Sequence, residues 1–381
     1  MSVLKVYLIA GEPSGDLLGS RLMRALKKQT NGQVRFMGVG GETMEKEGLK
    51  SLFNIKDLAV MGFMEVIPSI PKILKHLDEI VKDIKTKKPD IVMTIDSYSF
   101  SARVHKKLKA AGYEKPHVHC VAPQVWAWKK GRAKKIAKFV DHLFCLLPNE
   151  TSYFEPYGMA TTFIGHPVIE GGADKGNKAA FCKKYKINPK ATVLCMLPGS
   201  RKNELKYLLP IFKESVEELQ RKIPNLFVVI PTVQTVADKL RKGLNYWQVP
   251  HLIVEGEKER YDAFAAADVA LAASGTVSLE LAMAGVPHLI AYKVSPLTGF
   301  LARHLLKIRF VNLLNILSDR EIIPELLQEN CTVDKIVEKV RRLLAHPDQK
   351  TNQSLKKLGL GAPYSPSDKM ASVLRKMVRK K

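Results

Sequence analysis

A carboxylate among small residues follows the first predicted strand of the chain. Residues 11–16 are Gly-Glu-Pro-Ser-Gly-Asp, placed between an apolar run and a segment of helical period. The glycines permit a tight turn, and Ser14 or Asp16 could cap the next helix, but neither role explains Glu12. Since open α/β folds bind ligands at the carboxyl edge of their sheets, we predict that Glu12 contributes to a functional site.

Asp96 occupies the same type of position, directly after the buried run Asp90–Ile95. A partly desolvated aspartate at the end of a strand could have a raised pKa and act as a general base. The spacing alone favours a simpler role, as the N-cap of a helix that begins near Ser99. From its position, Asp96 is therefore a candidate for either catalysis or capping.

Two tryptophans follow another predicted strand. Trp126 and Trp128 lie in a loop, and Lys129–Lys138 then contains six basic residues and no acidic one. Indole rings next to cationic side chains could stack on a base, hold a sugar or sit on a membrane. We take Trp126 as a candidate for contact with an acceptor or a membrane.

A long helix follows the strand that ends in Leu-Pro-Gly-Ser-Arg at 197–201. The first N–H groups of a helix have no acceptor within the helix, and its dipole favours negative charge at this end. Arg201 adds a guanidinium suited to phosphate. This segment therefore predicts an anion site.

The strongest motif is a second strand-to-helix turn. Ser274, Gly275 and Thr276 make the turn, and Glu280 lies one helical turn later. This spacing can place a diphosphate at the start of the helix while Glu280 accepts hydrogen bonds from two ribose hydroxyls. We predict that these four residues bind a nucleoside diphosphate.

Several common signatures are missing from the sequence. There is no G-x-G-x-x-G after the first strand, no P-loop, no H-E-x-x-H and no Asp-x-Asp pair. The ten histidines show no ligand spacing, and the five cysteines have no short pair spacing. A dehydrogenase, a P-loop ATPase and a metal-dependent transferase all become less favoured, and we expect neither a metal nor another cofactor.

Short apolar runs alternate with longer segments of helical period. The runs are continuously apolar, which is typical of strands buried on both faces of a parallel sheet. They predict strands at 6–10, 34–39, 90–95, 117–122, 142–147 and 162–164, and then at 192–197, 226–231, 251–254, 269–273 and 288–292. The fold class is therefore α/β, with two Rossmann-like parallel sheets.

A Gly/Pro-rich stretch at 165–172 separates the two series of strands. We therefore predict a first domain at 1–165 and a second at 166–354. The last segment, 355–381, has apolar residues on one helical face, and we expect it to complete the first domain.

The charge balance limits the choice of partner. The 381 residues include 61 Lys and Arg against 37 Asp and Glu, a formal net charge of +24 at pH 7. This excess favours a nucleic acid, an anionic membrane surface or a phosphorylated substrate. No apolar run approaches the roughly 20 residues of a membrane span, and the first residues do not resemble a secretory signal, so we expect a cytoplasmic protein.

Two apolar stripes carry basic residues beside them. One begins at Phe63 and Met64 and continues at helical spacing to Leu77, and the other surrounds Phe300 within 297–309. Core packing is the ordinary role of such stripes. Mixed basic and apolar residues also suit lipid headgroups, so Phe63, Met64 and Phe300 are candidates for membrane contact.

Five motifs occur in an order typical of one family. From about residue 5 to residue 330 the chain resembles the lipid-A-disaccharide synthases. The motifs are Ala-Gly-Glu-Pro-Ser-Gly-Asp at 10–16, Pro-Gln-Val-Trp-Ala-Trp at 123–128, Leu-Pro-Gly-Ser-Arg at 197–201, Ser-Gly-Thr at 274–276 with Glu280, and Asn-Leu-Leu-Asn at 312–315. Five motifs in order are far more specific than any one of them.

The resemblance implies a GT-B glycosyltransferase, in which two Rossmann-like domains face each other. It implies UDP-2,3-diacylglucosamine as donor, 2,3-diacylglucosamine 1-phosphate (lipid X) as acceptor, and a β-1′,6-linked disaccharide 1-phosphate and UDP as products. It favours Asp96 as the catalytic base and gives functional importance to Glu12, Arg201, Glu280 and Asn315. The sequence departs from the family at position 99, where a serine replaces a common second acid.

These substrates predict a mechanism and a location. An α-linked donor that gives a β product requires inversion, with Asp96 accepting the proton of the acceptor 6-hydroxyl. Arg201 and the helix start at 274–276 would stabilise the departing UDP. We expect a peripheral protein on the cytoplasmic face of the anionic inner membrane, and a homodimer is a further candidate assembly.

Two other functions are consistent with parts of the sequence. A UDP-N-acetylglucosamine 2-epimerase would share the uridine site but needs additional acid/base residues and no apolar surface. An RNA- or DNA-binding protein would use the positive charge, but that charge is spread over both halves and no RRM, KH or helix-turn-helix pattern occurs. We therefore expect no nucleic-acid partner.

Overall fold

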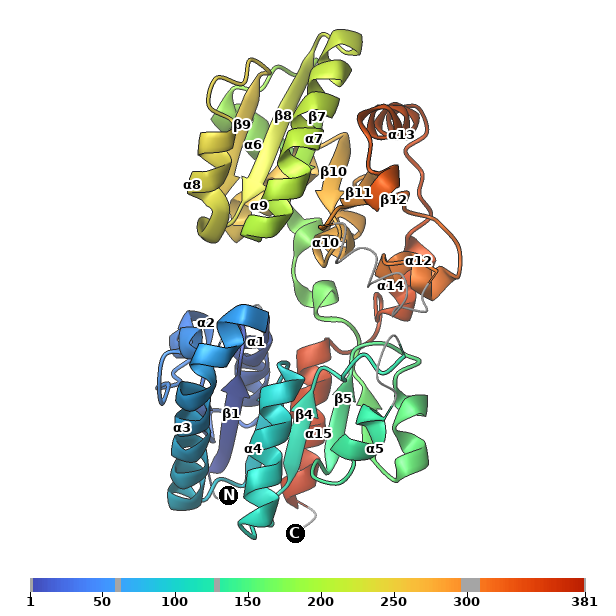
Figure 1. Ribbon diagram of the computed structural model, residues 1–381. Helices are drawn as coiled ribbons and strands as arrows, with labels where there is room; N and C mark the ends of the chain where they lie inside the picture. The colour runs from blue at the N-terminus through green and yellow to red at the C-terminus, as the bar shows by residue number, and fades with distance from the viewer. Residues whose placement is uncertain (1–2, 59–62, 127–130, 296–308, 380–381) are drawn as a thin grey trace. The chain divides into compact units, whose positions relative to one another are not determined.

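The computed structural model describes residues 3–58, 63–126, 131–295 and 309–379, and for residues 63–70 the backbone alone. The chain forms two compact units, Met1–Pro167 with Gly361–Lys381 and Val168–Leu360. The chain therefore crosses from the first unit to the second after residue 167 and returns after residue 360. The predicted domain boundaries lie after residues 165 and 354. Each unit contains a six-stranded sheet in which every neighbouring pair is parallel. The prediction of an α/β protein with two parallel sheets is confirmed (Figure 1).

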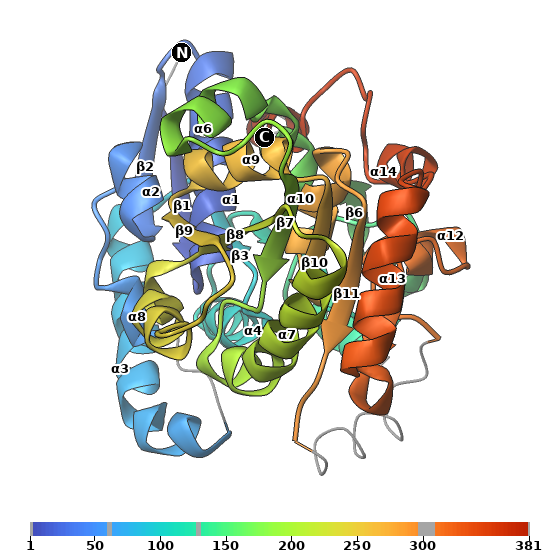
Figure 2. The ribbon, with the colours of Figure 1, turned by 90° about the horizontal axis from the view of Figure 1, so that it is seen from above.

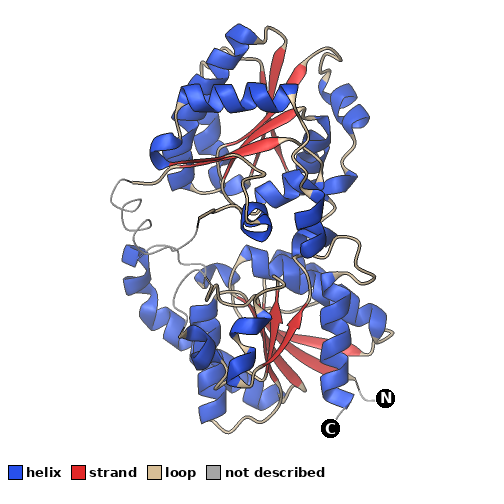
Figure 3. Cartoon of the chain, turned by 90° about the vertical axis from the view of Figure 1, so that its right-hand side faces the viewer, coloured by secondary structure: helices blue, strands red, loops and turns tan. Residues whose placement is uncertain are grey.

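The amino-terminal unit has the strand order β2-β1-β3-β4-β5-β6. Its strands are β1 Leu4–Ala10, β2 Val34–Val39, β3 Ile91–Ile95, β4 His117–Cys120, β5 His142–Cys145 and β6 Ala160–Phe163. Its helices are α1 Pro13–Gln29, α2 Glu42–Lys46, α3 Phe63–Lys87, α4 Tyr98–Ala110, α5 Arg132–Ile136 and α15 Pro366–Arg379. In Figure 3 the red strands of this unit lie between blue helices, which explains why all five residues of β3 are buried.

The second unit has the strand order β12-β11-β10-β7-β8-β9, and Figure 2 shows its central strands side by side. Its strands are β7 Thr192–Leu197, β8 Leu226–Thr232, β9 His251–Glu255, β10 Val269–Ala273, β11 His288–Tyr292 and β12 Glu325–Leu327. Its helices are α6 Lys178–Tyr185, α7 Lys202–Lys222, α8 Gln234–Gly243, α9 Glu257–Ala266, α10 Val277–Met283, α12 Leu313–Ser318, α13 Val333–Ala345 and α14 Asn352–Lys357. The eleven predicted strands are all present, and β12 is an additional one.

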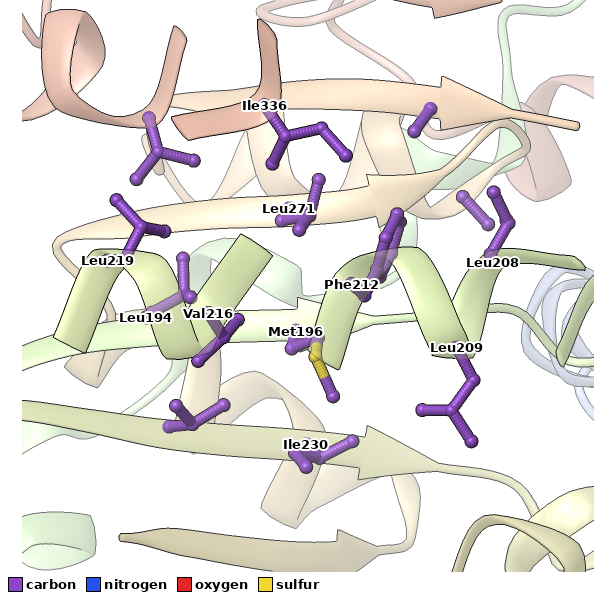
Figure 4. Close-up of a cluster of buried hydrophobic side chains, with 14 of the residues drawn as sticks. Leu194, Met196, Leu208, Leu209, Phe212, Val216, Leu219, Ile230, Leu271 and Ile336 are labelled. Atoms are coloured by element: carbon purple, nitrogen blue, oxygen red, sulfur yellow. The ribbon is translucent and has the colours of Figure 1, made fainter. Parts of the chain in front are cut away.

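Helix α7 shows how the second unit forms its core. Its buried side chains recur every three or four residues, as expected for a helix with one face on a sheet. Leu208, Phe212 and Leu219 lie on that face and are buried together with Met196 of β7 and Leu271 of β10 (Figure 4). Burying each such side chain contributes about 1.5–3 kcal/mol, so this face fixes the helix on the sheet.

The last helix packs in the first unit. Met370, Ala371 and Leu374 of α15 are fully buried in one cluster with Leu22 and Leu26 of α1. The Gln29 side chain also donates a hydrogen bond of 2.9 Å to the Asp368 carbonyl. Helix α15, red in Figure 1, thus lies among the blue and cyan elements of the amino-terminal unit. No helix in the described part of the chain is long and apolar enough to cross a membrane.

Candidate functional site

Each sheet has one point where the order of the strands reverses direction. In the first unit this point lies between β1 and β3, which pair from Val6 with Ile91 to Ala10 with Ile95. In the second unit it lies between β7 and β10, which pair from Leu194 with Val269. Loops leave such a point in opposite directions and open a crevice, so it is the usual ligand site of an open parallel sheet. The predicted motifs at 11–16, 96, 197–201 and 274–280 follow these four strands.

The first unit brings Glu12 and Asp96 into one hydrogen-bonded cluster. Ser97 donates its hydroxyl to Glu12 Oε1 over 3.1 Å, and Ser14 donates its hydroxyl to Asp96 Oδ2 over 3.3 Å. The other oxygen of Asp96 accepts the Ser97 N–H over 2.8 Å. Two carboxylates from neighbouring strand ends are thus held by two serines, an arrangement suited to accepting and orienting a substrate hydroxyl.

The backbone at Asp96 decides against the capping role. Helix α4 begins at Tyr98, and its N-cap is Ser97, so Asp96 precedes the capping position. Asp96 and Ser97 have φ of 60° and 44°, which is the left-handed region and costs non-glycine residues free energy. Strain of this kind is stored most often at functional sites, because the surrounding structure must maintain it.

Two neighbouring residues have structural roles. A Cβ at Gly11 would lie 2.6 Å from Ser97 Oγ. Only glycine therefore allows the loop that follows β1 to approach the loop that follows β3 this closely. Asp16, considered above as a cap for α1, instead accepts the N–H groups of Gly41 over 2.7 Å and Thr43 over 3.0 Å. The expectation of capping at α1 is therefore wrong for Asp16, which fixes the loop after β2.

The second unit contains a cavity of about 370 Å³ at its reversal point. Its lining includes Arg201, Ser274, Gly275, Thr276 and Glu280, so the structure brings five of the predicted donor residues together. A Cβ at Gly275 would meet nothing within 4 Å, which leaves open space above this turn. A site of this size and polarity, at this place in the fold, can hold a nucleotide.

The helix start after β7 is not an empty anion site. Glu204 Oε2 accepts the N–H groups of Ser200 over 2.8 Å and Arg201 over 3.2 Å. The Arg201 guanidinium donates to Glu204 Oε1 over 3.1 Å while its side chain stays 64% exposed. The carboxylate of Glu204 thus occupies the position predicted for an anion, and the exposed guanidinium remains accessible to a phosphate.

Arg260 of α9 is a lining residue that the sequence did not reveal. It forms an ion pair of 3.0 Å with Glu280, and its guanidinium lies 5.1 Å from the centre of the Tyr261 ring. Its Nε is buried and has no hydrogen-bond partner among the described residues. A buried donor in the lining of a polar cavity indicates a place for a ligand acceptor. Arg260 lies in the charged run 257–260, which is typical of a solvated helix face.

Asn315 does not line this cavity. Its amide nitrogen donates to the Ile323 carbonyl over 2.8 Å and to Glu325 over 2.7 Å. Its amide oxygen accepts the N–H groups of Ile322 over 2.8 Å and Ile323 over 2.9 Å. The fully buried amide is saturated by these contacts, so in this conformation Asn315 joins α12 to β12 and is not brought together with Arg201 and Glu280.

The predicted acceptor and membrane residues are only partly described. The Trp126 indole nitrogen is buried beside Glu150, whose carboxylate accepts the Leu147 N–H over 3.0 Å. Burial raises the pKa of Glu150 to about 7, although the hydrogen bonds from the Leu147 and Leu146 N–H groups and the nearby Trp126 side chain oppose this shift. Phe63 and Met64 begin α3, but their side chains lie outside the described part, as does all of Phe300. No group of His, Cys, Asp and Glu in the described residues could hold a metal ion.

Each unit also buries a histidine whose charge is suppressed. Burial lowers the pKa of His119 in β4 and of His288 in β11 to about 4. His288 Nε2 accepts the Ser278 hydroxyl over 2.7 Å, and its Nδ1 donates to the Val286 carbonyl over 2.9 Å, so the neutral ring is fully used. The Asn312 amide in turn donates to the Ser278 oxygen, which connects α10 to α12.

We expect the free energy of unfolding to fall as the pH is lowered from about 6.5 towards 4. In that window the unfolded imidazoles bind protons and the buried ones do not, so protonation favours unfolding. At about 1.4 kcal/mol per pKa unit, each ring accounts for roughly 3 kcal/mol at most. Urea unfolding at pH 7 and pH 5 measures the difference.

The matched pair for this measurement is His288→Gln and His346→Gln. His346 is exposed, so its loss should leave the dependence on pH unchanged, whereas the loss of His288 should reduce it. Equal dependence in both variants would show that His288 does not contribute to the acid sensitivity.

Solved structures with the same fold bind uridine nucleotides. The chain is similar to S. aureus MnaA in complex with UDP, with a TM-score of 0.63 and 15% identity over 99% of this chain and 97% of that one. It is also similar to UDP-GlcNAc 2-epimerase from Neisseria meningitidis bound to UDP-GlcNAc, with a TM-score of 0.62 and 12% identity over 99% and 100%. At these identities the likeness shows the fold alone, and the predicted GT-B fold is confirmed.

Closer relatives share the sequence as well as the fold. The chain is 49% identical to lipid-A-disaccharide synthase of Paramagnetospirillum magneticum over 98% of its own length and 97% of that protein. It is 49% identical to the synthase of Rhodospirillum centenum over 93% and 88%. A sequence model for lipid-A-disaccharide synthetase matches residues 6–371. With matches of this length and identity, the chain belongs to the lipid-A-disaccharide synthase family of UDP-sugar glycosyltransferases.

Proposed function

We propose that the protein transfers the sugar of UDP-2,3-diacylglucosamine to the 6-hydroxyl of 2,3-diacylglucosamine 1-phosphate and releases UDP. The observation that carries this proposal is that one chain of this family contains two different sites, one in each unit. The first unit presents two hydrogen-bonded carboxylates at its reversal point, and the second presents a polar cavity with two arginines and Glu280. A proton acceptor and a nucleotide site are the two requirements of this reaction.

On the donor side, we assign Glu280 to the ribose and the arginines to the diphosphate. The Glu280 side chain is 19% exposed and Arg260 holds it from one side, so it is oriented within the lining. Arg201 offers a guanidinium to the phosphates, and Gly275 and Thr276 of the turn offer backbone N–H groups, whereas the Ser274 N–H donates to the Ala291 carbonyl over 3.2 Å. Negative charge grows on UDP as it departs, and these donors lower the barrier by stabilising it.

On the acceptor side, Asp96 accepts the proton of the attacking hydroxyl. The donor is α-linked and the product β-linked, so a single inverting displacement is expected, with an oxocarbenium-like transition state. Asp96 needs one free oxygen lone pair for this step, and its only side-chain partner among the described residues is Ser14 at the long distance of 3.3 Å. Glu12 fixes Ser97 and with it the Asp96 turn.

The direct test is to incubate the purified protein with both lipid substrates and to analyse the products. A tetraacyl disaccharide 1-phosphate that appears together with one equivalent of UDP supports the proposal. Free diacylglucosamine with UDP would indicate hydrolysis instead. Epimerised UDP-N-acetylglucosamine from that substrate alone would support the epimerase alternative.

We extend the proposal to the cytoplasmic face of an anionic membrane, where both substrates would reside. Supporting this, the net charge is +24, and Leu74 of α3 is 46% exposed between Lys72 and Lys75. The same predicted stripe ends in Leu77, which is only 5% exposed and belongs to the core. The described side chains of the stripe therefore range from the exposed Leu74 through the partly exposed Ile73 to the buried Leu77.

We expect the protein to sediment with vesicles rich in phosphatidylglycerol and to be released as the salt concentration rises. Cationic residues near an anionic surface contribute about 1 kcal/mol each, and salt screens that attraction. Leu74→Ser should weaken the binding, whereas Val3→Ser, at an equally exposed 46%, should not. Equal recovery on phosphatidylcholine vesicles, or none on either kind, would contradict a charge-driven membrane contact.

A further inference from the structure

A second cavity, of about 540 Å³, lies in the amino-terminal unit between α4 and α5. We call it the cationic pocket. Its lining includes Tyr98, Ser99, Arg103, Lys106, Arg132 and Lys135, and it contains no acidic residue. Four cationic side chains around one hollow, with no carboxylate between them, indicate an anionic ligand.

The helical spacing places these side chains along one surface. Ser99, Arg103 and Lys106 lie four and three residues apart on α4, so they share a face of that helix. Arg132 and Lys135 lie three residues apart on α5. The packing of α4 against α5 thus creates a cluster that neither segment has by itself.

Aromatic rings hold two of the cations over the hollow. The Arg132 guanidinium lies 5.1 Å from the centre of the Tyr98 ring, and the Lys106 ammonium lies 5.6 Å from the centre of the Phe139 ring. Cation–π contacts at these distances are attractive and limit side-chain freedom. The charges are therefore arranged in advance of binding, which reduces its entropic cost.

The rest of α4 provides an internal comparison. Lys107 and Lys109 form ion pairs with Asp78 and Asp141. In contrast, Arg103, Lys106 and Lys135 have no ion-pair partner among the residues that the structure describes. Neighbouring unpaired cations repel one another, so an anion between them would stabilise the unit.

The position of the pocket connects it with the candidate base. Tyr98 and Ser99 follow Asp96 by two and three residues, so their Cα atoms lie within about 11 Å of that of Asp96. A sugar phosphate, with its hydroxyl at one end and its anionic group at the other, covers part of this distance, and the long arginine and lysine side chains of the pocket can cover the rest. The pocket is thus within reach of a ligand whose hydroxyl is at Asp96.

We propose that the cationic pocket binds the phosphate monoester of the acceptor sugar and thereby sets the position of its attacking hydroxyl. The inference rests on the function proposed above and names the residues that would bind its acceptor substrate. Arg132 and Arg103 would donate hydrogen bonds to the phosphate oxygens. The Tyr98 and Phe139 rings would pack against the sugar ring or against the first methylene groups of its acyl chains.

The test compares two double variants with the same change of charge on the same helix. Arg103→Ala with Lys106→Ala removes two cations of the pocket, and Lys107→Ala with Lys109→Ala removes two paired cations outside it. The measurements are KM for the acceptor, with and without its phosphate, KM for the donor, and calorimetric binding of glucosamine 1-phosphate.

The pocket variant should raise KM for the phosphorylated acceptor by about ten- to a hundredfold, since charge-assisted hydrogen bonds are lost. It should leave KM for the donor unchanged and remove the preference for a phosphorylated acceptor. Retained preference in this variant, or an equal loss in the control variant, would overturn the proposal.

The calorimetric measurement with glucosamine 1-phosphate distinguishes a failure of this proposal from a failure of the proposed function. If the wild-type protein makes no disaccharide, the proposed function fails, and binding of glucosamine 1-phosphate that the pocket variant loses would still support the pocket. No binding by the wild type would overturn it. Competition by inorganic phosphate or by phosphatidic acid vesicles as strong as that by glucosamine 1-phosphate would assign the pocket to a free phosphate or a lipid headgroup, and would also overturn it.

Discussion

Asp96→Asn is expected to lower kcat by about 10²–10⁴-fold, the usual contribution of a positioned proton acceptor. Asparagine is the informative replacement because it is tolerated in the left-handed region, where Asp96 has φ of 60°. It also keeps an oxygen that can accept the Ser97 N–H. The turn should persist while the negative charge that accepts the proton is lost, and steady-state kinetics with both lipid substrates measures the effect.

Two controls show whether the loss belongs to the chemical step. UDP binding by calorimetry and the melting temperature should match the wild type, because the nucleotide cavity is in the other unit. Ser14→Ala removes only the 3.3 Å hydrogen bond to Asp96 and should reduce kcat far less. Near-normal turnover in Asp96→Asn would exclude this carboxylate as the base.

Glu280→Ala is expected to weaken UDP binding by about ten- to a hundredfold. The change removes the acceptor assigned to the ribose hydroxyls, and hydrogen bonds to a charged group contribute about 1.5–3 kcal/mol. It also leaves Arg260 without the carboxylate that lies 3.0 Å from it. Calorimetric titration with UDP gives the dissociation constant directly.

Glu259→Ala is the matched control on α9. Glu259 pairs with Lys184 and Tyr185, outside the lining of the cavity. Its loss should leave the affinity for UDP unchanged. If Glu280→Ala binds UDP as tightly as this control, the ribose is held elsewhere and the assignment of the cavity must change.

The strands were predictable because parallel sheets covered on both faces demand continuous apolar runs. Strand β12 was not, since it has three residues and begins with Glu325. Its position follows instead from a tertiary contact, because the Glu325 carboxylate accepts the N–H groups of Val311 over 2.9 Å and Asn312 over 3.0 Å. Local pattern contains no information about such a contact.

The same distinction applies to the functional residues. Glu280 was found because its spacing from the turn Ser274–Thr276 is local in sequence. Arg260 was missed because only the packing of α9 beside β10 and α10 brings it to the same cavity. Arg103 likewise has no signal until α4 and α5 are placed together. Residues contributed by a second element are the ones that periodicity and spacing do not reveal.

The return of α15 to the first unit has a consequence for synthesis of the chain. Residues 168–360 form the second unit as one continuous stretch, whereas the first unit lacks Met370 and Leu374 until the last helix has been made. At about 5–20 residues per second, translation from the end of α1 at Gln29 to the start of α15 at Pro366 takes on the order of 15–70 s, and the apolar face of α1 waits that long for this partner. The nascent first unit therefore presents Leu22 and Leu26 to chaperones, or to aggregation, throughout translation of the second.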